Sequence, residues 1–493
     1  MRLALLAFVL ALVACGPGGR NNGGPCVGEE CNGGTCDTPG DTRECYTGHA
    51  DTEGVGPCAG GTQMCLASGG WGNCVGQVLP APEMCGDGID NNCNGLTDED
   101  IDQDGDGFTT CGGDCCDSTE CSDPVLVNPT AFDVPNNGVD DDCNGTIDDT
   151  IPVCDYALPS NSQTAMDYAR AIDLCQIATM ADKKWGVLEA TLTLADGTGV
   201  PAADAHSIRT KYGTNVVPQG GQSFMMISTG IAGAATDTNP TGDGFYSSDE
   251  GTASGFPADF VAANGGTLPN SPGCPAPNGG GANDPVMLNL KIRVPSNAHS
   301  FSIKSNFYSS EFPEYTCSPY NDFFVILLDS TYAGTPPNPT DKNLAFYSPM
   351  NSTMKYPVGV NLAAGNTGLF TQCNNGATGC DGTPGNIMTC IGTNDLAGTG
   401  MDMVDGVCDG SSTVGGATGW LSTTGNVAPG EIITLRIGIW DTSDPVLDSL
   451  ALIDAFTWSV DGSDPGTVIG KATPPAGMPG AISRATGLAV PTN

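Results

Sequence analysis

Apolar and polar residues alternate along several stretches in the second half of the chain. The pattern covers residues 286–294, 301–307 and 433–439. Because successive side chains of a strand point to opposite faces, this period of two predicts antiparallel strands with one buried face. Residues 323–328 are a continuous apolar run and are expected to form a central strand. Together these segments predict a β-sandwich over residues 151–465, followed by a tail over 466–493.

One short amphipathic helix is expected in this region. It covers residues 165–175, and Thr164 and Asp167 are placed like an N-terminal cap. The connections between the strands are long and rich in Gly, Pro, Asn and Ser, which is typical of the loops of a mainly β domain.

The beginning of the chain has the pattern of an export signal. Arg2 is followed by an apolar run over residues 3–14, too short to remain as a membrane span. The sequence LVAC ending at Cys15 resembles a bacterial lipobox, so residues 1–14 are expected to be a lipoprotein signal peptide and Cys15 the lipidated residue. Gly16, and not Asp, follows the cysteine, and the resemblance to Gram-negative lipoproteins then implies sorting to the outer membrane, with the protein at the cell surface or on the periplasmic face. The alternative is an ordinary secretory signal that ends near a cysteine.

Residues 15–25 are expected to be a flexible tether, and lipid is the only membrane anchor expected. The chain of 493 residues has a formal charge of −40, which repels nucleic acid and anionic membranes and attracts cations. Disorder is the alternative for so acidic a chain, but 39% of the residues are hydrophobic and 23 are cysteines.

The cysteine distribution favours disulfides in an oxidising compartment. Without Cys15, 14 cysteines fall in residues 26–150 and 8 in residues 151–493. Both counts are even, so each half can close its own disulfides, with a connectivity that the counts leave open. Residues 26–80 hold seven of them and little apolar periodicity, so this Cys-rich segment is expected to depend on disulfides for its shape.

Residues 81–150 are the most acidic part of the chain, with 19 Asp and Glu and no Lys, Arg or His. They contain an internal repeat with an offset of 50 residues. The sequence GIDNNCNG at 88–95 matches GVDDDCNG at 138–145, and Asp98 matches Asp148. Between the first copy and the second copy lie residues 102–117, called the central loop below, which begin with the sequence DQDGDGF at 102–108.

The central loop has the residue pattern of a calcium-binding loop. Calcium takes six to eight oxygen ligands, and a loop with Asp at positions 1, 3 and 5 and Gly at position 6 supplies them from alternate residues. Gly113 stands where an EF-hand has its bidentate Glu, and no flanking helix is expected, so this is not an EF-hand. The expected ligands are Asp102, Asp104, Asp106, Asp114 and Asp117.

The two copies carry a similar alternation of oxygen-bearing side chains. Without cations so many carboxylates would repel one another, so divalent ions are expected to be part of the fold of these metal-binding repeats. The alternative is an acidic linker whose Asp and Gly only form turns. The expected ligands of the copies are Asp90, Asn92, Asn94 and Asp98, and Asp140, Asp142, Asn144 and Asp148.

The predicted fold class is mainly β, with disulfide-rich, calcium-loop N-terminal modules followed by an antiparallel β-sandwich with long loops and one short helix.

Residues 85–95, 102–108, 112–115 and 137–145 resemble the metal-binding repeats named after the copper protein MopE, and are similar to thrombospondin type 3 calcium loops. The resemblance implies a disulfide between Cys85 and Cys93. Pro135 replaces the first of these cysteines in the second copy, so Cys143 needs another partner. The family name suggests copper, but oxygen ligands and the lack of His make Ca²⁺ the expected ion.

Residues 224–230, 307–317, 321–324 and 435–458 resemble the choice-of-anchor L domain, and the resemblance spans most of residues 155–462. That family is extracellular and its members reach the surface by varied anchors, so the resemblance implies a setting and no reaction. Acidic residues in this region suggest a second calcium site, and solvated turn carboxylates and caps are the alternative. Its expected ligands are Glu311, Asp322, Asp441, Asp448 and Asp454.

No catalytic motif stands out, so an enzyme is not expected and no catalytic residue is assigned. The expected function is a surface-anchored, calcium-stabilised lipoprotein whose sandwich binds or adheres to an extracellular glycan or protein. One alternative is a secreted-type hydrolase on a metal-stiffened stalk, with a carboxylate pair such as Glu311 and Asp454. The other is a metal-scavenging lipoprotein.

Overall fold

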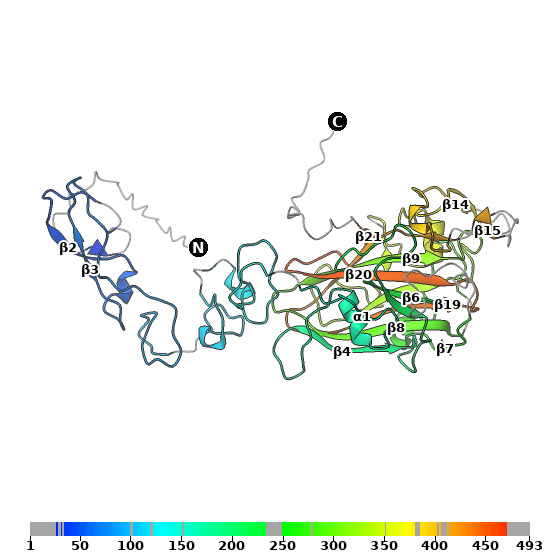
Figure 1. Ribbon diagram of the computed structural model, residues 1–493, viewed down its shortest axis with the longest axis horizontal. Helices are drawn as coiled ribbons and strands as arrows, with labels where there is room; N and C mark the ends of the chain where they lie inside the picture. The colour runs from blue at the N-terminus through cyan, green and yellow to red at the C-terminus, as the bar shows by residue number, and fades with distance from the viewer. Residues whose placement is uncertain are drawn as a thin grey trace, which may run out of the picture. The chain divides into compact units, whose positions relative to one another are not determined.

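The computed structural model divides the chain into two compact units, residues 1–128 and residues 129–493 (Figure 1). The predicted signal peptide, Cys15 and the tether lie outside the described residues, as does most of the predicted tail. No helix in the described part of the chain is long and apolar enough to cross a membrane. The structure describes residues 26–27, 31, 34–98, 102–118, 121, 123–149, 152–232, 249–277, 280–350, 352–379, 385–401, 404–405, 412–413 and 415–470.

The first unit begins with a small sheet in the order β1-β2-β3, and disulfides make up much of its interior. Cys26, Cys31 and Cys45 are buried together, and the dependence of this segment's shape on its disulfides stays a prediction. The strands are β1 (Cys26–Val27), β2 (Thr42–Tyr46) and β3 (Gly61–Met64), and the disulfides are Cys26–Cys31, Cys36–Cys65 and Cys45–Cys74.

The second unit contains two antiparallel sheets that pack face to face. The first sheet has the order β10-β19-β8-β4, with β7 paired to β8. Its strands are β4 (Gly186–Thr193), β7 (Ala253–Ser254), β8 (Ala282–Arg293), β10 (Phe323–Asp329) and β19 (Ile432–Thr442). The second sheet has the order β21-β18-β9-β20-β6-β5, with β17 paired to β9. Its strands are β5 (His206–Arg209), β6 (Phe224–Ser228), β9 (Ser300–Ser309), β17 (Gly416–Ala417), β18 (Leu421–Asn426), β20 (Ser449–Ser459) and β21 (Gly466–Ile469).

The connections contain short ribbons and 3₁₀ turns, and disulfides between described residues close three of these connections. The ribbons pair β11 (Phe346–Tyr347) with β12 (Tyr356–Pro357), β13 (Gly376–Thr378) with β14 (Gly385–Ile387), and β15 (Val404–Asp405) with β16 (Ser412–Thr413). The 3₁₀ turns are η2 (Ala50–Thr52), η3 (Thr110–Gly112), η4 (Pro124–Leu126), η5 (Val360–Gly365) and η6 (Asn394–Leu396). The disulfides are Cys154–Cys175, Cys274–Cys317 and Cys373–Cys390.

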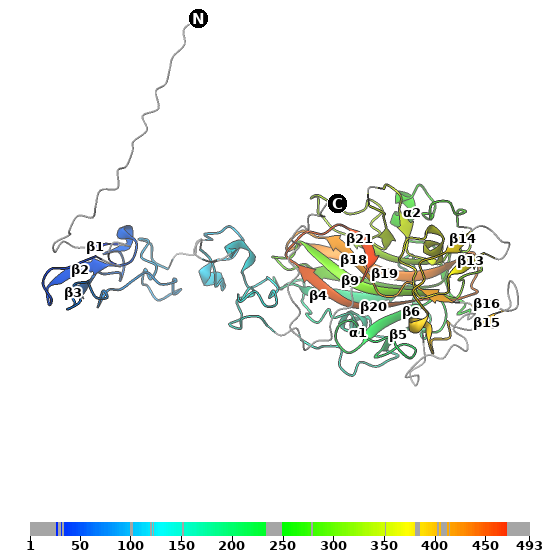
Figure 2. The ribbon, with the colours of Figure 1, turned by 90° about the horizontal axis from the view of Figure 1, so that it is seen from above.

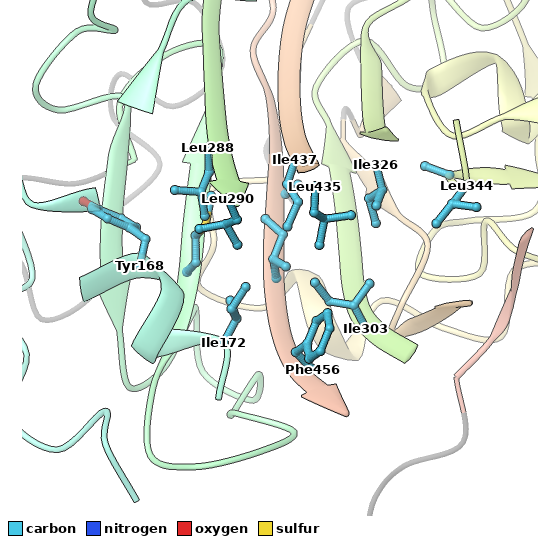
Figure 3. Close-up of a cluster of buried hydrophobic side chains, with 14 of the residues drawn as sticks. Tyr168, Ile172, Leu288, Leu290, Ile303, Ile326, Leu344, Leu435, Ile437 and Phe456 are labelled. Carbon is cyan, nitrogen blue, oxygen red and sulfur yellow. The ribbon is translucent and has the colours of Figure 1, made fainter. Parts of the chain in front are cut away.

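The main core lies between the two sheets and confirms the period-two prediction. The alternating apolar residues of β8, β9 and β19 all point into one buried cluster. Figure 3 shows Leu290 and Leu435 of the first sheet near Ile303 and Phe456 of the second, with Ile172 beside them. The mainly antiparallel β class predicted from the sequence is therefore confirmed.

The apolar run at 323–328 is a strand, β10, but it is the edge strand of its sheet and not a central one. Both of its faces are buried because α2 (Ala258–Ala263) and its neighbours cover the side that faces away from the main core. Its open edge is partly paired by loops, since Leu328 N–H donates to the Lys342 carbonyl at 2.9 Å. A continuous run of apolar residues indicates that both faces of a strand are buried. An edge strand is also buried on both faces when loops enclose it.

The expected helix is present but shorter than predicted. The helix α1 covers Ala165–Ala171, and it lies beside β4 and β6, near both sheets (Figure 2). Thr164 occupies the N-cap position without a side-chain cap hydrogen bond, and Asp173 with φ 69° follows the end of the helix. The second helix, α2, was not predicted.

The second unit also includes the second acidic copy. Residues 129–132, which precede this copy and are called the strap below, form hydrogen bonds with the sandwich. The Trp185 indole N–H donates to the Ala131 carbonyl at 2.9 Å. Asn297 closes a reciprocal pair with the backbone of Phe132, with distances of 3.0 and 2.9 Å. These bonds tie the start of the second copy to the sandwich.

Candidate metal centre

The central loop folds around the carboxylate of Asp102. Its Oδ1 accepts the Gly105 N–H at 2.6 Å and its Oδ2 accepts the Gly107 N–H at 2.9 Å. Both glycines have positive φ, 83° and 95°, which a glycine adopts without strain. The alternation of Asp and Gly thus forms the tight turn that a cation loop requires.

All five aspartates predicted for the central loop converge. Asp102, Asp104 and Asp117 each offer one oxygen within 4.8 Å of the others. Asp104, Asp106 and Asp114 form a second group of the same size, so Asp104 belongs to both. This spacing is compatible with oxygens that share one cation at 2.3–2.6 Å.

Two oxygens of this group are buried and have no hydrogen-bond partner among the described residues, namely Oδ2 of Asp104 and Oδ2 of Asp114. The remaining oxygens are held by the surrounding chain. Asp117 accepts the Gln103 N–H at 2.6 Å, and Asp106 accepts the Asn128 amide at 2.8 Å. The loop is therefore ordered by hydrogen bonds, and two oxygens remain available to a cation.

The electrostatics of the central loop disfavour the charged carboxylates when no cation is bound. Burial, followed by the carboxylates of Asp106, Asp104 and Asp117, raises the pKa of Asp114 to about 6. Burial also raises the pKa values of Asp104 and Asp106, and neighbouring carboxylates add to the effect. A bound divalent cation would oppose both causes.

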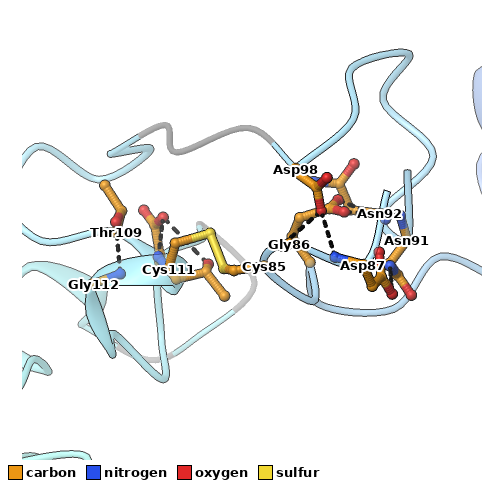
Figure 4. Close-up of a disulfide and its surroundings, with 12 residues drawn as sticks. Cys85, Gly86, Asp87, Asn91, Asn92, Asp98, Thr109, Cys111 and Gly112 are labelled. Carbon is orange, nitrogen blue, oxygen red and sulfur yellow. Dashed lines mark hydrogen bonds between the residues drawn. A yellow bond between two sulfur atoms is a disulfide. The ribbon is translucent and has the colours of Figure 1, made fainter. Parts of the chain in front are cut away.

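The first copy contains a different acidic group from the predicted one (Figure 4). Asp98 accepts the N–H groups of Gly86, Asp87 and Gly88 at 2.9–3.2 Å. The three acids whose oxygens lie within 4.8 Å of one another are Glu83, Asp87 and Asp98, of which only Asp98 was predicted.

The remaining predicted residues of the first copy shape the turn. Asp90 accepts the N–H groups of Asn94 and Gly95 at 3.1 and 2.9 Å. Asn92 Oδ1 also accepts the Asn94 N–H, and Asn94 Oδ1 accepts the N–H of Leu96. In the structure these three side chains therefore act as turn acceptors.

The second copy repeats this geometry with the same 50-residue offset. Asp140 accepts the N–H groups of Asn144 and Gly145 at 3.1 and 2.9 Å, as Asp90 does in the first copy. Asp148 accepts the N–H groups of Asn137 and Gly138, and its φ of 52° is close to the 50° of Asp98. The internal repeat is thus a repeat of structure.

The remaining acids of the second copy are arranged more loosely. Asp142 Oδ1 accepts the Asn144 N–H at 3.2 Å. Asp133, at the position of Glu83, accepts the N–H groups of Asp141 and Asp149 and was not predicted. Within the described part of this copy, no three acidic, His or Cys ligand atoms lie within 4.8 Å of one another.

The disulfide between Cys85 and Cys93 implied by the resemblance is wrong. Cys85 pairs with Cys111 of the central loop, and Cys93 pairs with Cys58 of the Cys-rich segment. Cys93 has a left-handed backbone, φ 59°, and is buried with Cys58 and Tyr46. The repeats are therefore joined to neighbouring segments, and Cys143, which lacked an obvious partner, is also disulfide-bonded.

Only part of the second predicted site comes together. Glu311, Asp322, Asp441 and Asp448 gather at one end of the sandwich, and all are at least 97% buried, so they are not solvated turn carboxylates. No three of these four described residues have oxygens within 4.8 Å of one another. Burial, then neighbouring carboxylates, raises the pKa values of Glu311 and Asp441 well above their usual range. Asp454 lies within β20, six residues after Asp448, which directly precedes that strand, and this spacing is roughly 20 Å at the rise of a strand.

Asp454 belongs to a separate buried group. It accepts the N–H groups of Gln219 and Gly220, and burial and Asp173 raise its pKa to about 8. Asp155 Oδ2 accepts the Ser223 N–H nearby, and both Asp155 and Asp454 are almost fully buried. Asp155 and Asp173 were not singled out from the sequence because nothing in their local pattern indicates a site.

One family model matches the chain, and it carries the description "putative metal-binding motif" and the name of copper-binding MopE. It matches residues 80–99 and 122–149, which are the two acidic copies on either side of the central loop. No curated protein and no solved structure matches the chain. The chain therefore combines a metal-binding motif with an antiparallel β-sandwich, while the resemblance to the choice-of-anchor L domain stays a prediction.

Proposed function

We propose that this protein is a calcium-stabilised lipoprotein, anchored through Cys15 outside the cytoplasm, whose β-sandwich binds a glycan or protein ligand. The observation that carries the metal part is the convergence of five aspartates in the central loop. Asp104 takes part in both carboxylate groups, and its Oδ2 is buried without a hydrogen-bond partner. A buried, unpartnered carboxylate oxygen is costly unless a cation compensates it.

The chemistry of the donors favours calcium over copper. The two acidic groups of the central loop contain carboxylates alone. Copper prefers imidazole and sulfur ligands, but this segment has no His, and Cys85, Cys93 and Cys111 are tied up in disulfides. Calcium prefers oxygen and tolerates irregular loops.

The disulfides support a location outside the cytoplasm, because such bonds persist in oxidising compartments. The anchor itself can be tested directly. Metabolic labelling with a fatty acid should mark the wild-type chain and leave Cys15→Ser unlabelled. An unlabelled wild-type chain found only in the soluble fraction would contradict lipid anchoring.

A binding role for the sandwich is preferred to hydrolysis. Asp454 is paired with Lys304 of β9, and Glu311 lies beyond the C-terminal end of that strand. Glu311 and Asp454, the pair considered for a glycosidase mechanism, are therefore roughly 20 Å apart along the sandwich, more than the roughly 5–9.5 Å typical of such enzymes. Surface presentation of a rigid β-sandwich needs no catalytic pair. Binding to an array of glycans and cell-surface proteins, with hydrolysis of the same ligands assayed in parallel, tests this part, and turnover of any of them would contradict it.

The metal part is tested on the full chain after treatment with a chelator. We expect calorimetry to show calcium binding to the wild type and an affinity lower by at least about tenfold in Asp104→Asn, which removes the shared ligand. Asp37→Asn, an exposed aspartate outside the repeats, is the matched control and should bind like the wild type. Copper binding without calcium binding, or unchanged affinity in Asp104→Asn, would refute the proposal.

A further inference from the structure

We propose that the sandwich holds a second divalent-cation site, independent of the acidic repeats, at one end of the space between its sheets. Four strand ends meet there and supply the ligands. Asp441 is the central ligand, and the others are Glu311, Asp322 and Asp448.

In the first sheet the strand register brings two of the acids together. Phe323 of β10 is paired with Trp440 of β19, so the antiparallel register sets Asp322 opposite Asp441. Thr442 confirms this register, since its hydroxyl donates to the Asn321 carbonyl at 2.7 Å. Phe323 and Trp440 belong to the cluster on the outer face, so Asp322 and Asp441, one residue away, lie on the face toward the second sheet.

In the second sheet the other two acids are adjacent in the same way. Ser309 at the end of β9 is paired with Ser449 at the start of β20. The next residue, Ser310, donates its N–H to the Asp448 carbonyl at 3.1 Å, and Glu311 follows it directly. The two sheets also contact each other here, because the Ser449 hydroxyl donates to Asp322 Oδ2 at 2.6 Å.

Within the described residues no ion pair involves Glu311, Asp322 or Asp441. Lys342 and Arg436 instead pair with Asp329, which is at the opposite end of β10.

Unpartnered oxygens point to a ligand. Both carboxylate oxygens of Asp441, which is 1% exposed, and Oε2 of Glu311 are buried and have no hydrogen-bond partner among the described residues. A proton shared between Asp322 and Asp441 would satisfy one oxygen of Asp441 and leave its other oxygen and Glu311 Oε2 unsatisfied. A cation between them would satisfy all three, and the four carboxylates carry enough oxygens for the six to eight ligands of calcium. Because no three of these residues have oxygens within 4.8 Å of one another in the described structure, binding of the cation would also draw the side chains together.

The backbone nearby leaves room for this arrangement. A Cβ added to Gly230 would lie 2.0 Å from Asp448 Oδ2, so a larger residue at this position would force the Asp448 carboxylate to shift. The ion would therefore connect the ends of β9, β10, β19 and β20 and join the two sheets.

The number of bound ions tests the inference. The full chain is equilibrated with calcium, and the bound metal is measured by mass spectrometry for the wild type, Asp441→Asn and Asp104→Asn. Asp259→Asn is the control, because Asp259 is paired with Arg436 and Lys342 and should hold no ion. We expect Asp441→Asn to lose one calcium equivalent and Asp259→Asn to lose none.

Thermal unfolding provides a second readout, followed by tryptophan fluorescence, since four of the five tryptophans lie in residues 129–493. In EDTA, Asp441→Asn should melt at a higher temperature than the wild type, because it removes a buried carboxyl group that forms no ion pair among the described residues. On addition of calcium, the melting temperature of Asp441→Asn should rise by less than that of the wild type. We expect Glu311→Gln to behave in the same way as Asp441→Asn, so it can replace that variant if Asp441→Asn does not fold.

Undiminished calcium content in Asp441→Asn and Glu311→Gln would overturn the inference. If Asp104→Asn loses calcium in the same experiment, the proposed function of the repeats stands while the sandwich site fails. Loss in Asp441→Asn alone would have the opposite meaning, so the two proposals fail separately.

Discussion

Replacing Asp454 by Asn should remove part of the pH dependence of the sandwich's stability. Burial, with the carboxylate of Asp173, raises the pKa of Asp454 to about 8. The folded state therefore keeps a proton that the unfolded chain releases above about pH 4. The stability contributed by this proton is fully present below pH 4 and is lost as the pH rises through 8.

The magnitude follows from the number of protons. One proton that is bound in the folded state and released on unfolding changes the free energy of unfolding by about 1.4 kcal/mol per pH unit. Between pH 5 and pH 7 the wild type should therefore lose up to about 3 kcal/mol through Asp454 alone. The amide in Asp454→Asn does not titrate. Over this pH interval the free energy of unfolding of the variant should therefore rise by up to about 3 kcal/mol relative to that of the wild type.

Urea unfolding at pH 5, 6 and 7, followed by tryptophan fluorescence in EDTA, measures the difference. Asp464→Asn, an exposed aspartate of the same unit, should keep the wild-type slope. Equal slopes for Asp454→Asn and the wild type would show that Asp454 holds no proton in the folded state, and the reasoning would be refuted.

Three further predictions concern other parts of the chain. Burial lowers the pKa of His206 to about 4, so stability should be lost as the pH falls from about 6.5 toward 4, and His206→Gln should lose less in the same urea assay; an unchanged loss would contradict this. Replacing Cys58 and Cys93 by Ser opens a disulfide with a sequence separation of 35 and should destabilise the first unit by about 4 kcal/mol, seen as faster hydrogen exchange in β2 and β3; unchanged exchange would argue against that bond. A Cβ on Gly425 would lie 2.5 Å from Leu344 Cδ1, so Gly425→Ala should cost roughly 1–3 kcal/mol in thermal unfolding, and a wild-type melting temperature would show that the core can yield there.

The parts of the fold that depend on local pattern were predictable. The alternation in β8, β9 and β19 identifies the buried face, because period two is a property of one strand. The position of β10 at the edge of its sheet was not predictable from the sequence. It depends on α2 and on the loop near Lys342, and no local pattern connects these segments to that strand.

The same distinction holds for the sites. The five aspartates of the central loop converge because their spacing in the chain sets the turn. Glu83 and Asp133 were missed because they precede the repeated motif, although their own 50-residue offset was a signal that could have found them. The juxtaposition of Asp322 and Asp441 depends on the register of strands far apart in sequence, whereas Asp454 seemed close only because it follows Asp448 in the chain.

The strap at residues 129–132 has a practical consequence for dividing this chain. Because Trp185 and Asn297 hold Ala131 and Phe132, a shortened protein that starts at residue 151 would leave the indole N–H and the Asn297 amide without these partners. Such a fragment should be less stable than one that starts before Pro129. Any ion taken up by the second copy would also be thermodynamically linked to unfolding of the sandwich, so the longer fragment can report that occupancy through its own melting.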